Sequence, residues 1–172
     1  PPAQGLDLRH GCAAALEQIA AVPAGSLAEA RAVLARASRR RSTRSTVFND
    51  ASSRSHSLVF VEVQPRGALP GAAPALRLAL VDLAGSERLP PTEALPALVE
   101  ESRHINLSLS ALGSVIHALQ HRAAHLPFRA CVLTRLLEPF FAAEGRVTLC
   151  VCVSPEGCHA PETACSLAFA DR

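Results

Sequence analysis

L-R-L-A-L-V-D-L-A-G-S-E, the stretch from Leu76 to Glu87, joins a long apolar run to a short polar end. The part up to Leu83 is almost wholly apolar, which predicts a buried strand. Asp82 lies at the exit of this strand and Gly85 follows it closely. A carboxylate there can reach the hydration shell of Mg²⁺, and a glycine amide can approach a terminal phosphate. The stretch therefore fits a nucleotide-binding loop, although a plain strand and turn has the same pattern.

A second polar stretch, N-D-A-S-S-R-S-H from Asn49 to His56, precedes another strand-like run from Leu58 to Val63. The residues between this run and Leu76 are rich in proline and glycine, which predicts a loop joining two adjacent strands. Two polar loops that can contact phosphate, each beside one of these strands, favour a paired site over two unrelated turns.

These two stretches resemble switch I and switch II of a kinesin motor domain. Three further motifs agree in order and spacing, and the resemblance runs from about Ser26 to Arg172: I-N-L-S-L-S-A-L (Ile105 to Leu112), H-L-P-F-R-A-C-V-L-T-R-L-L (His125 to Leu137) and V-S-P-E-G-C-H-A-P-E-T-A-C-S-L-A-F-A-D-R (Val153 to Arg172). The resemblance implies an α/β fold, part of a three-layer P-loop NTPase-like head with a mixed central sheet flanked by helices. Residues 26–172 would be the C-terminal half of the head, preceded by a segment, residues 1–25, of uncertain structure.

The resemblance also implies roles for the first stretch. Asn49 would orient the loop, and the hydroxyls of Ser52 and Ser53 would reach the γ-phosphate or Mg²⁺. Arg54 would pair with Glu87, closing a gate that positions the attacking water when ATP is bound. Arg54, Glu87 and Ser53 are therefore the expected catalytic residues.

In the second stretch, Asp82 would hold Mg²⁺ through water, together with Ser53. Gly85 would supply the amide that senses the γ-phosphate, because the lack of a Cβ permits a close approach. The implied ligand is ATP with Mg²⁺.

The microtubule-facing part of a kinesin head has partial counterparts. Arg129 and Arg135 remain as cations that would contact tubulin. Leu107 and Val132 stand where kinesins typically carry lysine, so two cationic contacts are missing.

The phosphate cradle G-x-x-x-x-G-K-[ST] is absent from the sequence, which contains no lysine. Such a cradle supplies backbone amides and an ammonium to the phosphates of ATP. We therefore expect that no nucleotide binds tightly to this chain alone. In kinesins the strand that feeds the cradle lies beside the switch II strand, so Leu76–Leu83 would keep an unpaired edge.

Helical and strand patterns elsewhere predict the remaining elements. Ser26 and Glu29 form a capping-box signature, and Pro139 should strain or end the helix that contains it. The expected elements are helices at about Ser26–Ala37, Glu101–Arg122, Ala130–Phe141 and Pro161–Asp171, a strand at Arg146–Val153, and an uncertain helical pattern before Val22.

Composition bounds the remaining possibilities. The chain has 172 residues, 49% of them hydrophobic, a formal net charge of +2 and no apolar span of membrane length, which predicts one soluble domain. The six cysteines include no C-x-x-C pair, and we expect them to be reduced and mostly buried. We expect no metal at Cys150 and Cys152, nor at the helically spaced His117, His121 and His125, which lack an acidic partner.

The full-length protein is thus expected to be an ATP-hydrolysing, microtubule-associated motor of the cytoplasm and cytoskeleton, including the spindle or centrosome. A homodimer partner would bind through regions outside this chain. A natural C-terminus near Arg172 would favour the minus-end, C-terminal-motor branch.

The alternative is a non-catalytic module that binds microtubules or a partner subunit. An Arg-rich nucleic-acid binder ranks last, because aromatics are few and Arg39–Arg44 is the one basic run.

Overall fold

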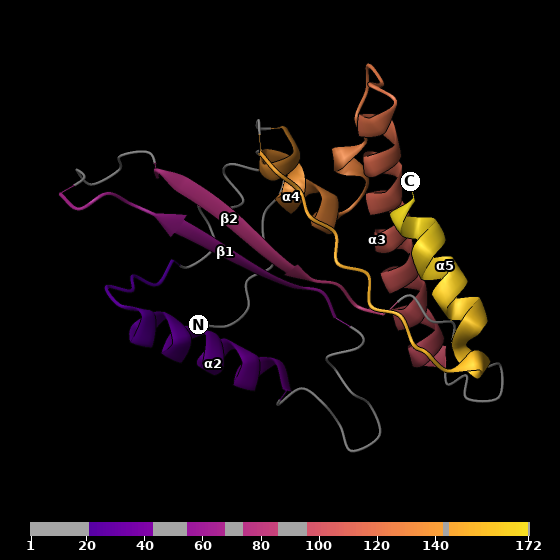
Figure 1. The fold of residues 1–172 in the computed structure, drawn as a ribbon, viewed down its shortest axis with the longest axis horizontal. Coiled ribbons are helices and arrows are strands. Elements are labelled where there is room, and N and C mark those ends of the chain that lie inside the picture. Colours follow the sequence, from indigo (N-terminus) through magenta and orange to yellow (C-terminus); the bar gives the residue numbers. More distant parts are fainter. Residues whose placement is uncertain (1–20, 43–54, 68–73, 86–95, 143–144, 172) are drawn as a thin grey trace. The chain divides into compact units, whose positions relative to one another are not determined.

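The computed structural model describes residues 21–42, 55–67, 74–85, 96–142 and 145–171. The chain forms two compact units, one of residues 34–85 and the other of residues 1–33 with 86–172. The described elements are helices and one antiparallel strand pair, so the predicted α/β class is confirmed (Figure 1). Among the described residues, no helix combines the length and the hydrophobicity that a membrane span requires.

The smaller unit contains a β-hairpin. Strand β1 (Ser57–Val63) pairs antiparallel with β2 (Leu76–Asp82), as the two strand-like runs predict. The register places Glu62 opposite Arg77, and their side chains form an ion pair at 2.9 Å. Both side chains are about half exposed, so this pair contributes only roughly 0.2–1 kcal/mol. The hairpin register is defined by the backbone pairing of β1 with β2.

The prediction that the Leu76–Leu83 strand is buried is wrong. Leu76, Leu78 and Leu80 are 58%, 46% and 50% exposed. A strand is buried on both faces only where other layers cover the sheet. Within the described part of the chain, the sheet has only two strands, and the outer edge of β2 pairs with no other strand.

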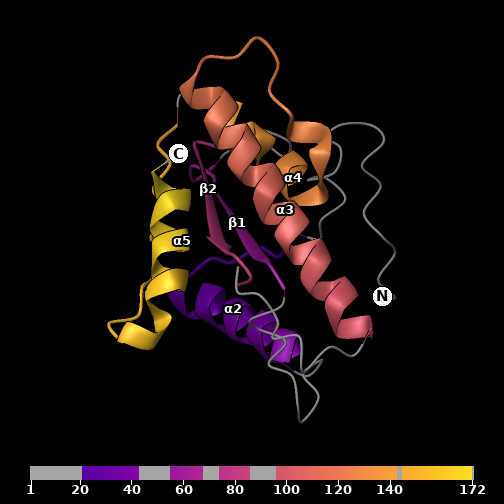
Figure 2. The ribbon, with the colours of Figure 1, turned by 90° about the vertical axis from the view of Figure 1, so that its right-hand side faces the viewer.

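The larger unit is built around α3 (Pro96–Gln120), which packs against the 3₁₀ turn η2 (Phe128–Ala130) and α4 (Val132–Ala142) (Figure 2). Helix α3 begins earlier than the predicted Glu101. The predicted apolar face is confirmed, because its members are buried or half-buried: Ile105, Leu109, Leu112, Val115, Ile116 and Leu119. On α4 the side chains of Leu133, Leu136 and Leu137 are buried.

Pro139 does not end α4, which continues to Ala142. A proline inside a helix removes one backbone hydrogen bond and crowds the preceding turn. The apolar face of α4 outweighs this cost, because burying each of its leucines contributes about 1.5–3 kcal/mol.

Helix α2 (Leu27–Ser42) begins as predicted and extends beyond the expected Ala37. The Ser26 hydroxyl accepts a hydrogen bond from the Glu29 N–H at 3.2 Å. The Glu29 carboxylate accepts one from the Gly25 N–H at 2.8 Å. The capping box is therefore present, with its second bond displaced by one residue along the chain.

The last part of the chain differs from the prediction at one place. Residues 145–153 form no strand, because a strand needs a hydrogen-bonded neighbour and none is found among the described residues. The 3₁₀ turn η3 (Gly157–His159) then leads into α5 (Ala160–Ala170), with Pro161 in its first turn as predicted.

The described cysteines are free thiols, but most are not buried. Cys131 is half-buried, whereas Cys150, Cys152, Cys158 and Cys165 are exposed. The expectation of mostly buried thiols is therefore wrong. For Cys150 and Cys152 the reason is that residues 145–153 have no sheet neighbour among the described residues.

Candidate functional site

The two polar stretches meet at one end of the hairpin. Strand β1 begins directly after His56, and β2 ends at Asp82, two residues before Ala84. Because the strands are antiparallel, the start of β1 lies beside the end of β2. There the His56 Nδ1 accepts a hydrogen bond from the Ala84 N–H at 3.0 Å. The last residue of N-D-A-S-S-R-S-H thus holds the backbone of D-L-A-G.

This hydrogen bond matters for stability because the Ala84 N–H is buried. Ala84 is only 4% exposed, and a buried backbone N–H without a partner costs about 1–3 kcal/mol. To accept this bond, the imidazole must carry its proton on Nε2. His56 therefore fixes the loop that follows β2.

Asp82 and Gly85 lie on either side of this anchor. Asp82 is opposite Ser57 at the last rung of the hairpin, and its side chain is exposed. An exposed carboxylate suits Mg²⁺, which prefers oxygen ligands and retains several waters. Gly85 is half-buried and ends the described segment. These two residues fit an outer contact to Mg²⁺ and a phosphate, but the described residues contain no further phosphate cradle.

The other predicted nucleotide-site residues, Asn49, Ser52, Ser53, Arg54 and Glu87, lie outside the described residues. Their contacts with nucleotide, and the pairing of Arg54 with Glu87, stay predictions.

His56 has a role that the sequence reasoning missed. The motif that predicts a phosphate-contacting loop ends in this histidine. The sequence contains a signal for this role, because a polar motif can bind its own neighbouring loop as well as a ligand. Only the hairpin register shows that His56 and Ala84 are close in space.

The second candidate surface involves α3, η2 and α4. Leu107 and Val132 are 56% and 54% exposed, so neither is packed against neighbouring helices. Their neighbours in sequence, Ser108 and Cys131, are in contact, because the Cys131 thiol lies 4.0 Å from the Ser108 carbonyl oxygen. Leu107 and Val132 therefore flank the junction between α3 and α4.

The junction between η2 and α4 is held by a reciprocal cap. The Thr134 N–H donates to Cys131 Sγ at 3.5 Å, and the Cys131 N–H donates to Thr134 Oγ1 at 3.2 Å. This arrangement is a capping box with a thiol in place of a hydroxyl. Thr134 is fully buried and also donates to the Phe128 carbonyl at 2.7 Å.

The two candidate cations are positioned by these contacts. Arg129 is exposed and lies in η2, whereas Arg135 is half-buried and lies in the first half of α4. Because Thr134 bonds to both η2 and the start of α4, it fixes the backbone that carries these two side chains. The sequence-predicted cations are thus on adjacent elements of one packed unit.

Comparison with known protein families identifies the family to which the chain belongs. The family model of the kinesin motor domain matches residues 5–172. The chain belongs to the kinesin motor domain family. The kinesin resemblance of the switch-like and helical motifs is therefore confirmed.

Curated kinesins with similar sequences come from plants. Kinesin-like protein KIN-14B of Oryza sativa is 39% identical over 91% of this chain and 19% of its own length. Kinesin-like protein KIN-14Q of Arabidopsis thaliana is 41% identical over 87% of this chain and 12% of its own length. The chain therefore spans less than a fifth of these relatives.

Solved kinesin structures share the fold. The C-terminal motor and motor homology domain of Kar3Vik1, fused to a synthetic coiled coil, is 35% identical with a TM-score of 0.72, covering 89% of this chain and 40% of its own. The motor domain of Kar3 from Saccharomyces cerevisiae is 38% identical with a TM-score of 0.67, covering 86% of this chain and 45% of its own. The chain thus corresponds to less than half of these kinesin structures.

Proposed function

We propose that this chain is the switch-bearing and microtubule-facing part of a kinesin head, in a protein that hydrolyses Mg·ATP and moves along microtubules. The observation that carries the proposal is the kinesin family match over residues 5–172. The convergence of the two switch motifs at His56 and Ala84 supports it.

On the nucleotide side, the anchored loop after β2 gives Asp82 and Gly85 a fixed backbone beside β1. Ser52, Ser53 and Asn49 act on the same ligand from the preceding loop. Arg54 and Glu87 close the gate that positions the attacking water. Phosphoryl transfer needs mainly positioning and charge stabilisation, which these groups supply. The bound Mg²⁺ would neutralise charge on the phosphates.

On the microtubule side, the packed unit of α3, η2 and α4 presents Arg129 and Arg135 to tubulin. A structural relative of the chain, KIF14 with ADP, is described in complex with a microtubule; it is 31% identical with a TM-score of 0.66. The protein would accordingly act on cytoskeletal microtubules, including those of the spindle or centrosome. The C-terminal-motor, minus-end branch and a homodimer through regions outside this chain belong to the same proposal.

The test is microtubule-stimulated ATP hydrolysis by a head that contains this chain and a P-loop. Arg54→Ala and Glu87→Ala should each abolish stimulation, and the double variant should be no worse than either single one, because the two residues act as a unit. Arg77→Ala and Glu62→Ala provide a matched control, since they break an exposed Arg–Glu pair on the hairpin. Additive losses at Arg54 and Glu87, or equal losses in the control pair, would refute the gate.

The second candidate is a non-catalytic module that binds microtubules or a partner subunit. The absence of G-x-x-x-x-G-K-[ST] from the sequence favours it for this chain taken alone. A G-x-x-x-x-G-K-[ST] motif upstream in the full-length transcript would favour the motor over this module. Calorimetric titration of this chain with Mg·ATP tests whether the two switch motifs alone hold nucleotide. Saturable binding tighter than about 1 mM, or about 4 kcal/mol, would contradict the expectation that no nucleotide binds tightly to this chain alone.

A further inference from the structure

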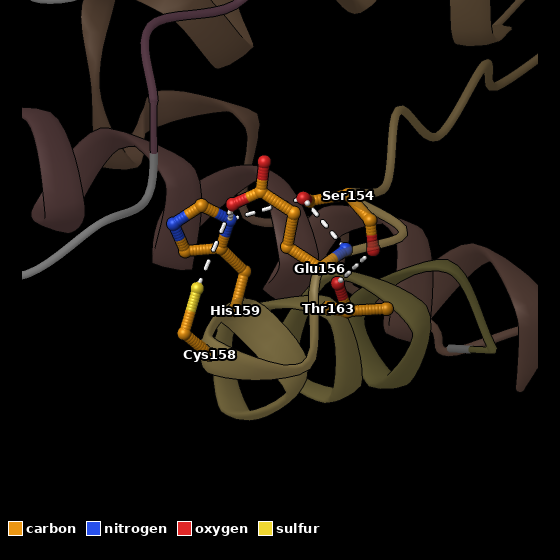
Figure 3. Close-up of polar contacts among 5 residues, drawn as sticks. All are labelled: Ser154, Glu156, Cys158, His159 and Thr163. Atoms are coloured by element: carbon orange, nitrogen blue, oxygen red, sulfur yellow. Dashed lines mark hydrogen bonds and ion pairs between the residues drawn. The ribbon is translucent and has the colours of Figure 1, made fainter.

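A cluster of unlike polar side chains lies where the chain enters α5. It comprises Glu156, Cys158 and His159, with Ser154 and Thr163 beside them (Figure 3). The 3₁₀ turn η3 brings Cys158 and His159 round to the carboxylate of Glu156. The nucleotide and microtubule proposals assign no role to these residues.

The distances from the Glu156 carboxylate to the other two ligand atoms match those of a metal site. The Glu156 carboxylate oxygen lies 3.6 Å from the Cys158 Sγ and 3.5 Å from the His159 Nδ1. One ligand atom from each of the three residues lies within 4.8 Å of the others. In a tetrahedral zinc site with bonds of about 2.0–2.3 Å, neighbouring ligand atoms are about 3.3–3.6 Å apart. Small side-chain movements would therefore suffice to place all three on one ion.

We propose that Glu156, Cys158 and His159 form a zinc-binding site. A thiolate, an imidazole and a carboxylate are three of the ligand types that Zn²⁺ takes, with a water in the fourth position. The thiolate disfavours Mg²⁺ and Ca²⁺, which select oxygen ligands. All three side chains are exposed, so the ion can enter directly from solvent.

The surrounding contacts hold the ligands in place. Ser154 Oγ lies 3.0 Å from the His159 Nδ1 and accepts from the Glu156 N–H at 3.3 Å. Thr163 donates to the Ser154 carbonyl oxygen at 3.5 Å, which ties the loop to α5. On zinc binding, His159 Nδ1 exchanges its contact with Ser154 for the metal. The site would then link the loop, η3 and the start of α5 through one ion.

A pair of histidines at the end of α3 provides a comparison, because it lacks a third ligand among the described residues. The rings of His117 and His121 have centroids 4.1 Å apart and planes tilted by 36°, but His121 Nδ1 bonds to the His117 carbonyl oxygen. Within the described ranges, this pair forms no three-ligand group with a cysteine or an acid. The convergence of three ligand types distinguishes the α5 cluster.

The test titrates the metal-free full chain with Co²⁺ in a non-thiol reductant and then displaces the Co²⁺ with Zn²⁺. Binding at the site should give a thiolate-to-cobalt charge-transfer band that saturates at one equivalent. Cys158→Ser and His159→Gln should each weaken zinc binding at least about tenfold. Cys165→Ser and His117→Gln are matched controls, because they replace exposed residues outside the cluster, and they should leave affinity unchanged.

A second measurement does not depend on variants folding. In the unaltered chain, Zn²⁺ should slow alkylation of Cys158 at least about tenfold and leave Cys165 unaffected, as read by mass spectrometry. Equal protection of both thiols, a charge-transfer band that survives in Cys158→Ser, or no protection of Cys158 would each overturn the proposal.

Discussion

His56 and Ala84, residues from two separate switch motifs, are joined by a hydrogen bond of 3.0 Å from the Ala84 N–H to the His56 Nδ1. The bond fastens the loop that carries Gly85 to the residue that precedes β1. The start of β1 and the end of β2 are thus joined by a bond outside the strand ladder.

Removing this link should destabilise the hairpin unit. We expect His56→Ala to lower the free energy of unfolding by about 1–3 kcal/mol, because the buried Ala84 N–H loses its acceptor. His104→Ala is the control, since His104 is exposed and pairs only at the surface with Glu100; its effect should stay within about 0.5 kcal/mol. Urea denaturation measures both. Equal effects of the two variants would contradict the anchoring role of His56.

The sequence predicted the parts of the fold that depend on local pattern. Periodicity sufficed for the buried face of α3, and the alternation of apolar runs with a Pro- and Gly-rich loop sufficed for β1 and β2. The kinesin family followed from motifs in order. The helix face and the two strands are each encoded within a short stretch of chain, and the family within the order of several such stretches.

Properties that depend on distant neighbours were not predictable in this way. The exposure of Leu78 and the absence of a strand at residues 145–153 depend on which other strands are present. Pro139 remains inside α4 because packing outweighs a local penalty. The contact of His56 with Ala84 depends on hairpin register, and the approach of Cys158 to Glu156 depends on a 3₁₀ turn.

The cap of α4 provides a second stability test. Thr134→Val keeps the shape of the side chain but removes its hydroxyl. The Phe128 carbonyl then loses a donor and the Cys131 N–H loses an acceptor. We expect a loss of about 1–3 kcal/mol, because Thr134 is fully buried. Ser114→Ala is the control, since it removes an exposed bond to the Ser110 carbonyl on α3. A loss at Thr134 no larger than at Ser114 would show that the cap is not needed.

Restoring charge at the junction of α3 and α4 should strengthen binding to microtubules. Leu107 and Val132 are exposed, so the double variant Leu107→Lys with Val132→Lys should remain folded. Tubulin presents an acidic surface, and each new surface pair should add about 0.2–1 kcal/mol, decreasing as salt screens the charges.

Co-sedimentation over a salt series measures this gain. The matched control adds two lysines to the hairpin instead, at the exposed positions Leu78 and Leu80. A folded Leu107/Val132 double variant with unchanged affinity, or an equal gain in the hairpin variant, would refute the assignment of this face to tubulin.

Co-sedimentation of the unaltered 172-residue chain with microtubules tests the central claim most directly, that these residues carry the microtubule-facing part of a kinesin head. We predict saturable binding at low ionic strength that weakens as salt rises and is reduced by Arg129→Ala, but not by Arg77→Ala on the hairpin. Circular dichroism confirms that both variants are folded. Failure of the folded chain to bind at low ionic strength, or binding that Arg129→Ala leaves unchanged, would contradict the claim.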